Sequence, residues 1–511
     1  MSSITIERKF ENENKLTNIF ISSNQDWKST ENQQLQVLES GSKGILMKQI
    51  IEAIHNAKRM ICLQSFLIQD TTIIDALINV VEKKKVKVYI MDSAESRLDN
   101  LLEEEEDFIA KEYVEMIDKK FKFRFVHRQA NNLHAKFILI DPISNPTGFL
   151  FTGNFNKKPF YENPELAVVL DTIQVNELFQ LFVYHFWNHT TDEQNSSQTF
   201  EKIKPVKVVK KPILKNILVT SPDTTLSNLK TTILKAVESA KTSIQFSTFG
   251  FDISHEISKV ILNKLKNGVA VTIFCRTRKK TIDNHLSLLL ENGANIFCHP
   301  LIHAKSILID HKKGFIFTAN FEKHGMDQGF EIGVSLKENQ IIDLALIYDS
   351  WQASFPYHFH HEYPIKDIDA YWQFNKEGKL EKKKLRLEEE KQNNRNIKKV
   401  ADFTDFFGTF KKPIVFAAKR ICIKKTAKFI ALKNPIKNEK RLEENLFKIT
   451  YEKKSIQKKK EVKVKVVAIL LRNHSSIDDD SLKKYIDILQ VKEFQNLEMY
   501  ITSEKKQTGL S

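Results

Sequence analysis

The sequence has few cysteines and no long apolar run, and both absences limit what the protein can be. Its 511 residues include four cysteines that lie far apart and form no Cys-x-x-Cys pair. Three of the four lie in strand-like apolar stretches, which fits buried free thiols in a reducing cytoplasm. No run approaches the roughly 18 apolar residues of a membrane-spanning helix. The first residues contain no long apolar segment, so we expect no secretory signal and a cytoplasmic protein.

The composition is that of a soluble globular chain with a basic excess. Hydrophobic residues make up 41% and charged residues 28%, and the length allows two or three domains with hydrophobic cores. The formal net charge is +15, and the isoelectric point is near 9.2. A positive excess attracts polyanions over a long, salt-sensitive range. Nucleic acid and an anionic membrane are therefore both candidate partners, and charge alone does not choose between them.

One four-part pattern occurs twice in the chain, in the same order. Each copy begins with an HxKxxxxD motif, continues with a Thr-x-Asn-Phe turn, and ends with a glutamate 11 residues after the asparagine. A repeated constellation is stronger than any lone motif, and it predicts one active site assembled from two half-sites. The members are His134, Lys136, Asp141, Asn154 and Glu165 in the first copy, and His303, Lys305, Asp310, Asn320 and Glu331 in the second.

The duplication extends beyond these motifs and predicts an α/β fold. Strands alternate with helices of 10 to 15 residues in both halves, which is typical of β-α-β units around a largely parallel or mixed sheet. We therefore predict α/β repeats over residues 15–190 and 213–355, joined by a polar linker over 191–212. The matching segments are strands 18–23 and 216–221, helices 47–57 and 229–240, strands 60–66 and 243–249, and strands 86–90 and 269–274.

The chain changes character after about residue 365, where Gly and Pro become rare and Lys becomes dense. Residues 413–433 combine apolar and basic side chains and have Pro413 at their start, which predicts a basic amphipathic helix. Residues 458–467 are interpreted as a strand. We treat 365–511 as a Lys-rich, mixed C-terminal region whose fold the sequence leaves open, and as a candidate surface for a protein partner.

The repeated residue types describe phosphoryl chemistry. Side chains two apart on a strand share a face, so each His is predicted beside its Lys, a nucleophile next to a fixed positive charge. Lys and Asn donors from both halves would stabilise the charge that develops on a transferring phosphoryl group. One neutral His can attack phosphorus, and the other, protonated, can give its proton to the leaving oxygen. A Glu on the far ring nitrogen of each His would set its tautomer. No metal or cofactor is required, because the cationic side chains supply the electrophile.

With these motifs the chain resembles the phospholipase D superfamily, whose signature is the HxKxxxxD pair, over about residues 15–355. The second repeat is most similar to the small bacterial Nuc-type endonucleases, through residues 247–254 and 266–271 and the 17-residue spacing from His303 to Asn320. The resemblance implies two α/β/α sandwich repeats packed as a pseudo-dimer, with the active site at their interface. It also implies metal-independent, two-step phosphodiester chemistry.

The resemblance further assigns roles to individual residues. It implies that His134 is the nucleophile and that His303 is the acid and base. It also implies a crossed arrangement, in which Glu331 braces His134 and Glu165 braces His303.

The turn that contains the asparagine departs from the family pattern, which is usually Gly-Ser-x-Asn. Neither repeat has the Gly-Ser pair. In the first repeat Asn154 and Asn156 are both candidates, and we favour Asn154 because it keeps the 11-residue spacing to Glu165. Asp141 and Asp310 belong to the motif, but each lies where a strand runs into a turn, so we interpret them as turn or packing residues.

Three further segments have functional and structural interpretations. The acidic run 103–107 is better explained as a solvated helix face than as a metal site. The histidine cluster 358–362 resembles a metal site, but no further ligand lies at a familiar spacing, so a structural role is favoured. Residues 276–280, with two arginines and two lysines, follow a strand at the presumed active edge and either bind phosphates or form a solvated loop.

Three functions remain open at this point. The first, which we predict, is a DNA-binding endonuclease or other nuclease that cleaves DNA or RNA; the Nuc-type likeness, the net charge and the Lys-rich tail favour it. The second is a phospholipase or phosphatidyl transferase of the cardiolipin-synthase kind; such enzymes usually carry membrane spans, but the basic segment 413–433 keeps it open. The third is a catalytically silent binding scaffold, which ranks lowest because both His-Lys pairs and both glutamates are intact.

Overall fold

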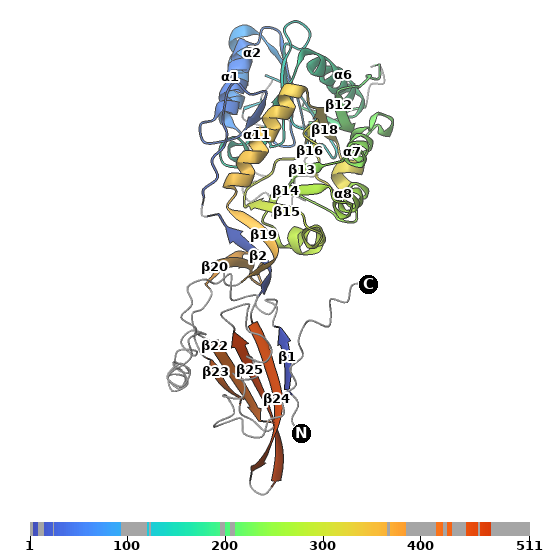
Figure 1. Cartoon of the computed structure of the whole chain (residues 1–511). Helices are drawn as coiled ribbons and strands as arrows, with labels where there is room; N and C mark the ends of the chain where they lie inside the picture. Colours follow the sequence, from blue (N-terminus) through green and yellow to red (C-terminus); the bar gives the residue numbers. More distant parts are fainter. Residues whose placement is uncertain are drawn as a thin grey trace. The chain divides into compact units, whose positions relative to one another are not determined.

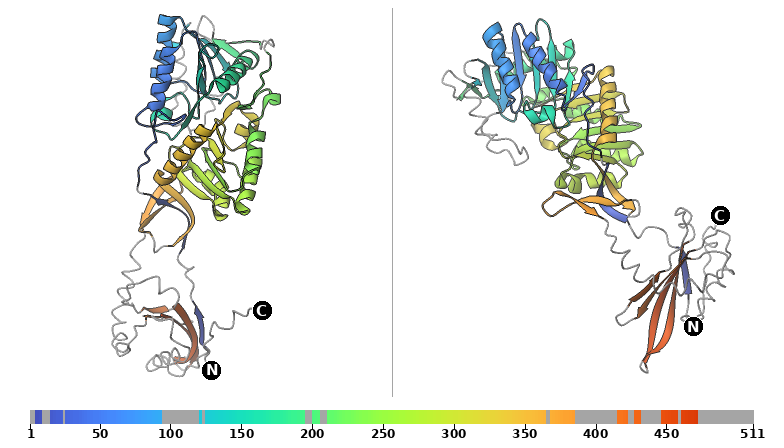
Figure 2. Two further views of the ribbon diagram at one scale, coloured as in Figure 1. Left: turned by 45° about the horizontal axis from the view of Figure 1, so that its top comes forward. Right: turned by 90° about the vertical axis from the view of Figure 1, so that its left-hand side faces the viewer.

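The computed structural model describes residues 4–8, 15–23, 25–93, 120–121, 124–194, 200–204, 210–364, 368–384, 415–422, 427–431, 446–457 and 460–471. Backbone contacts divide the chain into two units. The larger holds Leu16–Tyr363 and Ala370–Lys383, and the smaller holds Met1–Lys15, Pro364–Asp369 and Lys384–Ser511. The larger unit contains both predicted repeats (Figures 1 and 2).

The first repeat is built on a mixed sheet that has nine strands within the described residues. Its three central strands β6, β5 and β4 are parallel, and the other pairs are antiparallel. In order across the sheet the strands are β11 (Phe200–Lys202), β10 (Asp192–Gln194), β6 (Val126–Ala130), β5 (Lys87–Ser93), β4 (Met60–Gln64), β7 (Phe137–Ile140), β8 (Thr147–Phe151), β9 (Leu166–Val169) and β3 (Val37–Glu39).

The second repeat is built on a sheet that has eleven strands within the described residues. Its strands β13, β14 and β15 are parallel, and the other strand pairs whose register is described are antiparallel. In order the strands are β12 (Ile217–Thr220), β18 (Glu331–Ser335), β17 (Lys313–Phe317), β16 (Ser306–Ile309), β13 (Ser243–Thr248), β14 (Ala270–Arg276), β15 (Asn295–His299), β19 (Tyr357–Pro364), β2 (Lys15–Ser22), β20 (Ala370–Phe374) and β21 (Leu380–Lys384).

Seven strands of each sheet follow the same order, which confirms the predicted pair of α/β repeats. Strands β6-β5-β4-β7-β8-β9-β3 correspond to β15-β14-β13-β16-β17-β18-β12. Helices cover both sheets and connect their parallel strands. These helices are α1 (Ile45–Asn56), α2 (Thr71–Lys84), α5 (Lys157–Tyr161) and α6 (Thr172–Asn188) in the first repeat, and η1 (Thr224–Leu226), α7 (Leu229–Glu238), α8 (Glu256–Lys266), α9 (Lys279–Thr281), η2 (Ile282–Leu286), α10 (Ser287–Glu291), η3 (His324–Gln328) and α11 (Glu338–Ser354) in the second.

The core is layered, and one layer is shared by the two repeats. Helices α1 and α2 pack on the outer face of the first sheet, and α7 and α8 on the outer face of the second (Figure 1). A third cluster joins the inner faces of both sheets to α6 and α11. The two helices are tied across the interface, because Gln174 of α6 donates to the Ser335 carbonyl and Gln340 of α11 donates to the Val169 carbonyl, both at 3.1 Å. Burial on both faces explains why β7 is a continuous apolar run and why β16 is apolar after Ser306.

Three predictions about organisation are corrected by the topology. Residues 18–23 do not match 216–221: β2 joins the second sheet, and the true counterpart of β12 is β3, which pairs with β9 as β12 pairs with β18. The join expected to be a linker contributes β10 and β11, and β10 pairs with β6. Residues 370–383 belong with the repeats and not with the C-terminal region. Each error comes from pairing partners distant in sequence, which local patterns do not reveal.

The smaller unit contains a five-stranded antiparallel sheet among the described residues. The predicted basic helix over 413–433 is wrong, because β22 and β23 lie there and β22 pairs along its whole length with β25. Short apolar runs do not distinguish helix from strand, and here the distant partner strand decides. The predicted strand near 458–467 is confirmed within β25. The strands in order are β1 (Ile4–Arg8), β24 (Leu446–Gln457), β25 (Lys460–Leu471), β22 (Val415–Cys422) and β23 (Ala427–Ala431).

Candidate active site

Each His-x-Lys segment is hydrogen-bonded to the backbone of the opposite repeat. Both are predicted as strand residues, but β7 and β16 begin only after Lys136 and Lys305, and the motifs occupy the extended segments before them. The amide nitrogens of His134 and Ala135 donate to the Phe330 carbonyl, both at 2.9 Å. Those of His303 and Ala304 donate to the Pro164 carbonyl, both at 3.2 Å. Each motif is therefore held by the residue immediately before the glutamate of the other repeat.

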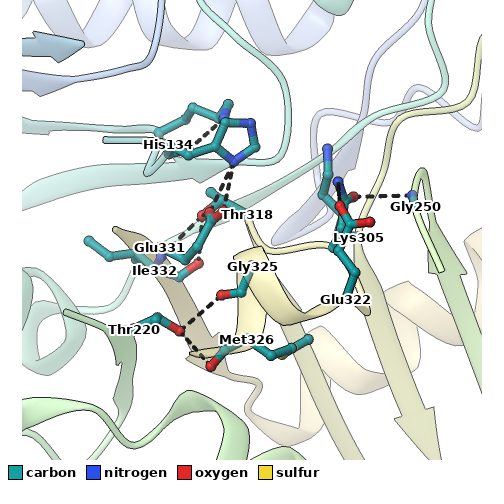
Figure 3. Close-up of polar contacts among 12 residues, drawn as sticks. His134, Thr220, Gly250, Lys305, Thr318, Glu322, Gly325, Met326, Glu331 and Ile332 are labelled. Atoms are coloured by element: carbon teal, nitrogen blue, oxygen red, sulfur yellow. Dashed lines mark hydrogen bonds and ion pairs between the residues drawn. The ribbon is translucent and has the colours of Figure 1, made fainter. Parts of the chain in front are cut away.

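The backbone exchange produces the crossed histidine–glutamate pairs predicted from the family resemblance. Nδ1 of His134 lies 3.0 and 3.1 Å from the two carboxylate oxygens of Glu331, and Figure 3 shows the ring facing this carboxylate. Nδ1 of His303 lies 2.8 Å from Oε1 of Glu165. Both glutamates are buried. With Nδ1–H donated to a carboxylate, the Nε2 lone pair of each ring faces away from its glutamate, as a nucleophile or base requires.

Two threonines outside the predicted set of site residues hold the glutamates in place. The hydroxyl of Thr152 donates to Oε2 of Glu165, and that of Thr318 donates to Oε2 of Glu331, both at 2.5 Å. Each hydroxyl also accepts the amide that follows the glutamate, from Leu166 at 2.9 Å or from Ile332 at 3.0 Å. The signal for them is present in the sequence, since the Thr-x-Asn turn is part of the duplicated pattern.

The charge of each site lysine affects the pKa of both site histidines. Burial lowers the pKa of His134 to about 3; the charge of Glu331 opposes this shift, and the charges of Lys136 and Lys305 reinforce it. Burial also lowers the pKa of His303 to about 4, with Lys305 and Lys136 acting in the same direction against Glu165. Each histidine therefore responds to the lysine of the other repeat. Together with the crossed histidine–glutamate contacts, this brings the two His-Lys pairs to the same part of the interface between the repeats.

The same contacts keep the glutamates ionised. Burial raises the pKa of Glu331, but the His134 ring and the charge of Lys136 outweigh burial and lower it to about 2. Glu165 is likewise lowered in pKa, because His303 and Lys305 outweigh its burial. The buried ammonium of Lys305 lies 2.9 Å from both ring nitrogens of His303 and 2.7 Å from its carbonyl. Nζ of Lys136 donates to the His134 carbonyl at 2.5 Å.

The two asparagines occupy equivalent positions but have different surroundings. Each carbonyl accepts the amide two residues on, from Asn156 to Asn154 and from Glu322 to Asn320, both at 2.8 Å, which supports the choice of Asn154 over Asn156. The Asn154 amide is buried, and its Oδ1 has no hydrogen-bond partner among the described residues. The side-chain nitrogen of Asn320 donates to Glu322 at 3.1 Å, and its oxygen accepts from the Gly250 amide at 3.3 Å.

The motif aspartates have the structural role that we predicted. Asp141 accepts the amides of Lys58, Arg59 and Met60 at 2.7–2.9 Å, and so fixes the start of β4. Asp310 accepts the three amides that begin β13, from residues 241–243, at 2.7–3.2 Å. Both residues have left-handed backbones, with φ of 47° and 51°, which Asp tolerates better than most side chains.

The remaining predicted features are peripheral to this arrangement. Rings of His358 and His360 lie 4.0 Å apart on β19, and burial lowers both pKa values. Within the described part of the chain no group of three or more His, Cys, Asp or Glu side chains could hold a metal ion. The acidic run 103–107 lies outside the described residues. Cys62, Cys275 and Cys298 are buried free thiols, as expected.

Comparison with known proteins agrees with this geometry. A family model described as "Cardiolipin synthase, PLD-like domain" matches residues 50–189 and 233–348, which together make half of the chain. The chain therefore belongs to this family of phospholipase-D-like domains, within a superfamily of phosphodiesterases and phosphotransferases. No curated protein matches the sequence. None of the described helices is long and apolar enough to cross a membrane.

Solved structures show weaker similarity. The phosphatidylserine synthase of Haemophilus influenzae aligns with a TM-score of 0.47 and 14% identity, over 67% of this chain and 90% of that one. The polyphosphate kinase of Porphyromonas gingivalis aligns with a TM-score of 0.43 and 14% identity, over 62% and 46%. Nuc of Salmonella typhimurium, a phospholipase D family member, aligns with a TM-score of 0.23 and 20% identity, over 28% and 97%.

Proposed function

We propose that the protein is a phosphodiesterase that works through a covalent phosphohistidine, and that its substrate is nucleic acid, DNA or RNA. The observation that carries the proposal is the crossed pairing of His134 with Glu331 and of His303 with Glu165. Because each imidazole is positioned by the other repeat, both rings and both buried lysines serve one reacting group. Two histidines, two ammonium groups and two carboxylates form a complete set for nucleophilic attack and proton transfer on a phosphodiester.

In the first step Nε2 of His134 attacks phosphorus. A nitrogen–phosphorus bond forms, the bond from phosphorus to the leaving oxygen breaks, and His303 gives that oxygen a proton. The substrate phosphate supplies the negative charge that favours a protonated His303, whose pKa is low in the free protein. In the second step His303 takes a proton from water, the water oxygen bonds to phosphorus, and the bond to His134 breaks. Lys136 and Lys305 balance the charge on the phosphoryl oxygens in both steps.

Nucleic acid is supported as the substrate by the net charge of +15 and by the likeness of the second repeat to Nuc-type endonucleases. A second candidate function is phosphatidyl transfer, in which an alcohol replaces water in the second step. It is favoured by the description of the matching family as cardiolipin synthase. Both functions use the same intermediate and differ in the molecule that carries the phosphodiester.

The two functions are separated by offering several substrates to the full chain in EDTA: plasmid, single-stranded DNA, RNA and anionic liposomes. We expect cleavage of nucleic acid that survives chelation and is lost in His134→Asn and His303→Asn. The matched control is His55→Asn, which changes an exposed histidine on α1. Release of lipid headgroup with no cleavage of nucleic acid would replace the nuclease proposal by the transferase. No turnover of any substrate would favour the binding scaffold.

The intermediate and the division of labour can be tested with bis(p-nitrophenyl) phosphate, whose leaving group departs without a proton. We expect His303→Asn to accumulate an acid-labile adduct on His134, observed by intact-protein mass spectrometry after an alkaline quench. His134→Asn should form no adduct. An adduct on position 303 would reverse the two roles, and turnover without any adduct in either variant would contradict the covalent route.

A further inference from the structure

The two half-sites differ in what lies beside each histidine. A phenylalanine follows the corresponding strand in each repeat, and its ring is near the histidine of that repeat: Phe66 with His134 at 5.8 Å and Phe249 with His303 at 5.1 Å between ring centroids. Phe66 is buried, whereas Phe249 is half-buried. The second half-site is therefore the one whose aromatic ring reaches the surface.

Two arginines lie against the half-buried ring of Phe249. The guanidinium carbons of Arg276 and Arg278 are 5.3 and 4.6 Å from the centroid of Phe249. Arg276 ends β14, and its Nε donates to the Pro300 carbonyl at 2.6 Å, which fixes the side chain. Contact with one aromatic face offsets part of the repulsion between the two cations. Phe249 thus contacts both His303 and the two guanidinium groups, and so holds the guanidinium groups near His303.

Arg278 is also linked to the predicted site asparagine. Burial lowers the pKa of Arg278, and the nearby charge of Glu322 opposes that shift. Glu322 in turn accepts the side-chain nitrogen of Asn320. Figure 3 shows Glu322 next to Lys305, on the second-repeat side of the site. Because Phe249 lies against His303 and against both guanidinium groups, the arginine pair belongs to the surroundings of His303.

The first repeat has no counterpart to this pair among its described residues. In the second repeat, Cys275 and Arg276 of β14 pair with Cys298 and His299 of β15. The equivalent pairs in the first repeat join Asp92 and Ser93 of β5 to Gln129 and Ala130 of β6. Ser93, a small and fully buried residue, therefore stands where Arg276 stands in the second repeat. Among the described residues, the arginine pair beside the site therefore lies on the second-repeat side alone.

We propose that Arg276, Arg278 and Phe249 form a subsite that binds the phosphate adjacent to the scissile phosphate of a nucleic-acid strand. This rests on the proposed nuclease function and gives it a substrate requirement. Lys136 and Lys305 already serve the reacting phosphoryl group, so the two arginines are available for a second anion. A guanidinium group can donate two parallel hydrogen bonds to the oxygens of one phosphate, which suits this anion. A polynucleotide presents such a phosphate at every linkage. The one-sided position of the pair would also set the direction in which the strand lies across the site.

The test compares a substrate that has two or more phosphates with one that has a single phosphate. Kinetics of Arg276→Gln/Arg278→Gln are measured on a short oligonucleotide and on bis(p-nitrophenyl) phosphate. We expect KM for the oligonucleotide to rise at least about tenfold more than KM for the small diester, with the salt slope of binding reduced by about 0.7 for one lost phosphate contact on a single strand. Lys279→Gln/Lys280→Gln is the matched control, because it removes the same charge from exposed residues on the neighbouring helix.

The complementary change is made in the oligonucleotide, where a neutral methylphosphonate replaces the phosphate next to the scissile one. It should weaken cleavage by the parent protein and have little further effect in the arginine variant, because both changes remove the same contact. Equal losses on both substrates, or an equal loss in the lysine control, would overturn the subsite while leaving the nuclease function intact. If the parent protein acts only on the small diester and on anionic liposomes, the nuclease function fails. The subsite for nucleic acid then fails with it.

Discussion

The two halves of the active site share a set of buried side-chain contacts and differ in what surrounds the phenylalanine beside each histidine. Each half supplies a buried lysine, a histidine bound to the opposite glutamate, and a threonine that orients its own glutamate. Phe66 is buried and Phe249 is half-buried, and two arginines lie against the Phe249 ring. On the proposed function, we expect the shared parts to perform the chemistry with the two imidazoles and the differing parts to select and orient the substrate.

A second difference lies within the chemical core itself. Lys305 contacts both ring nitrogens of His303, and Glu331 presents both carboxylate oxygens to His134. A carboxylate lies beside Nδ1 of both rings, so this contact alone does not distinguish the two histidines. An ammonium group next to the nitrogen lone pair of His303 reduces its nucleophilicity and is consistent with proton transfer.

The largest effect that would sharpen this comparison is removal of the charge of one glutamate. Glu331→Gln and Glu165→Gln should each lower kcat/KM on an oligonucleotide by about 10²- to 10⁴-fold, the range for loss of acid–base function. The two variants should differ on bis(p-nitrophenyl) phosphate. Formation of the adduct should remain fast in Glu165→Gln, because this leaving group needs no proton, and should be slow in Glu331→Gln. Stopped-flow release of p-nitrophenol measures this step. Equal slowing of the burst in both variants would contradict distinct roles.

The next effect concerns acid stability. Both site histidines have pKa values lowered by burial, to about 3 and about 4, so the unfolded chain binds their protons near pH 6.5 and the folded chain does not. The free energy of unfolding should therefore fall as the pH decreases below 6.5, by up to about 1.4 kcal/mol per pH unit for each histidine. His303→Asn should remove one such contribution between pH 6.5 and about 4. Urea unfolding at pH 7, 6 and 5 gives the slope, and a slope that is unchanged in the variant would show that His303 is not held neutral by the fold.

Much of the site could be predicted from sequence because duplication carries information that a single motif lacks. Two copies of a histidine, a lysine, an asparagine and a glutamate at matching spacings define equivalent positions by themselves. The crossed pairing of Glu331 with His134 follows from the family resemblance, and the structure shows it. The threonines belong to the same pattern but have no predicted role, because a hydroxyl that orients a carboxylate has no chemistry of its own in a phosphoryl-transfer scheme.

The failures arise where the partner of a segment is distant in sequence. Strand β2 resembles a first strand of the first repeat, yet it joins the second sheet, where it pairs with β20. Residues 413–433 resemble a basic helix, yet β22 is fixed by pairing with β25. The His-x-Lys segments are expected on strands, and backbone bonds to Phe330 and Pro164 hold them in extended loops instead. Local propensity is too weak to predict any of these pairings.

A smaller effect is expected at the motif aspartates, where the two halves differ in burial. Asp141→Ala and Asp310→Ala each leave three backbone amides without their acceptor and place alanine at a positive φ. Each should lower the free energy of unfolding by about 1–3 kcal/mol, more at the buried Asp141 than at the half-buried Asp310. Denaturant unfolding measures the loss, and activity per folded molecule should stay within about twofold, since neither side chain contacts the histidines. A loss of activity in fully folded protein would instead give the aspartates a chemical role.

The smallest effect is expected at the threonines. It tests whether Thr152 and Thr318, which make equivalent hydrogen bonds, support different steps of the reaction. Thr152→Val and Thr318→Val keep the shape of the side chain but remove the hydroxyl, so the glutamate loses a donor and the amide of Leu166 or Ile332 loses its acceptor. Each should reduce kcat by about 5- to 10-fold, which corresponds to about 1 kcal/mol for one hydrogen bond, and Ser at the same position should restore it. Because each threonine orients the glutamate on a different histidine, Thr318→Val should slow adduct formation and Thr152→Val should slow its hydrolysis. If the same step is slowed in both variants, the two glutamates act together on that step. The functional difference between the two halves would then lie at Phe249 and the arginines.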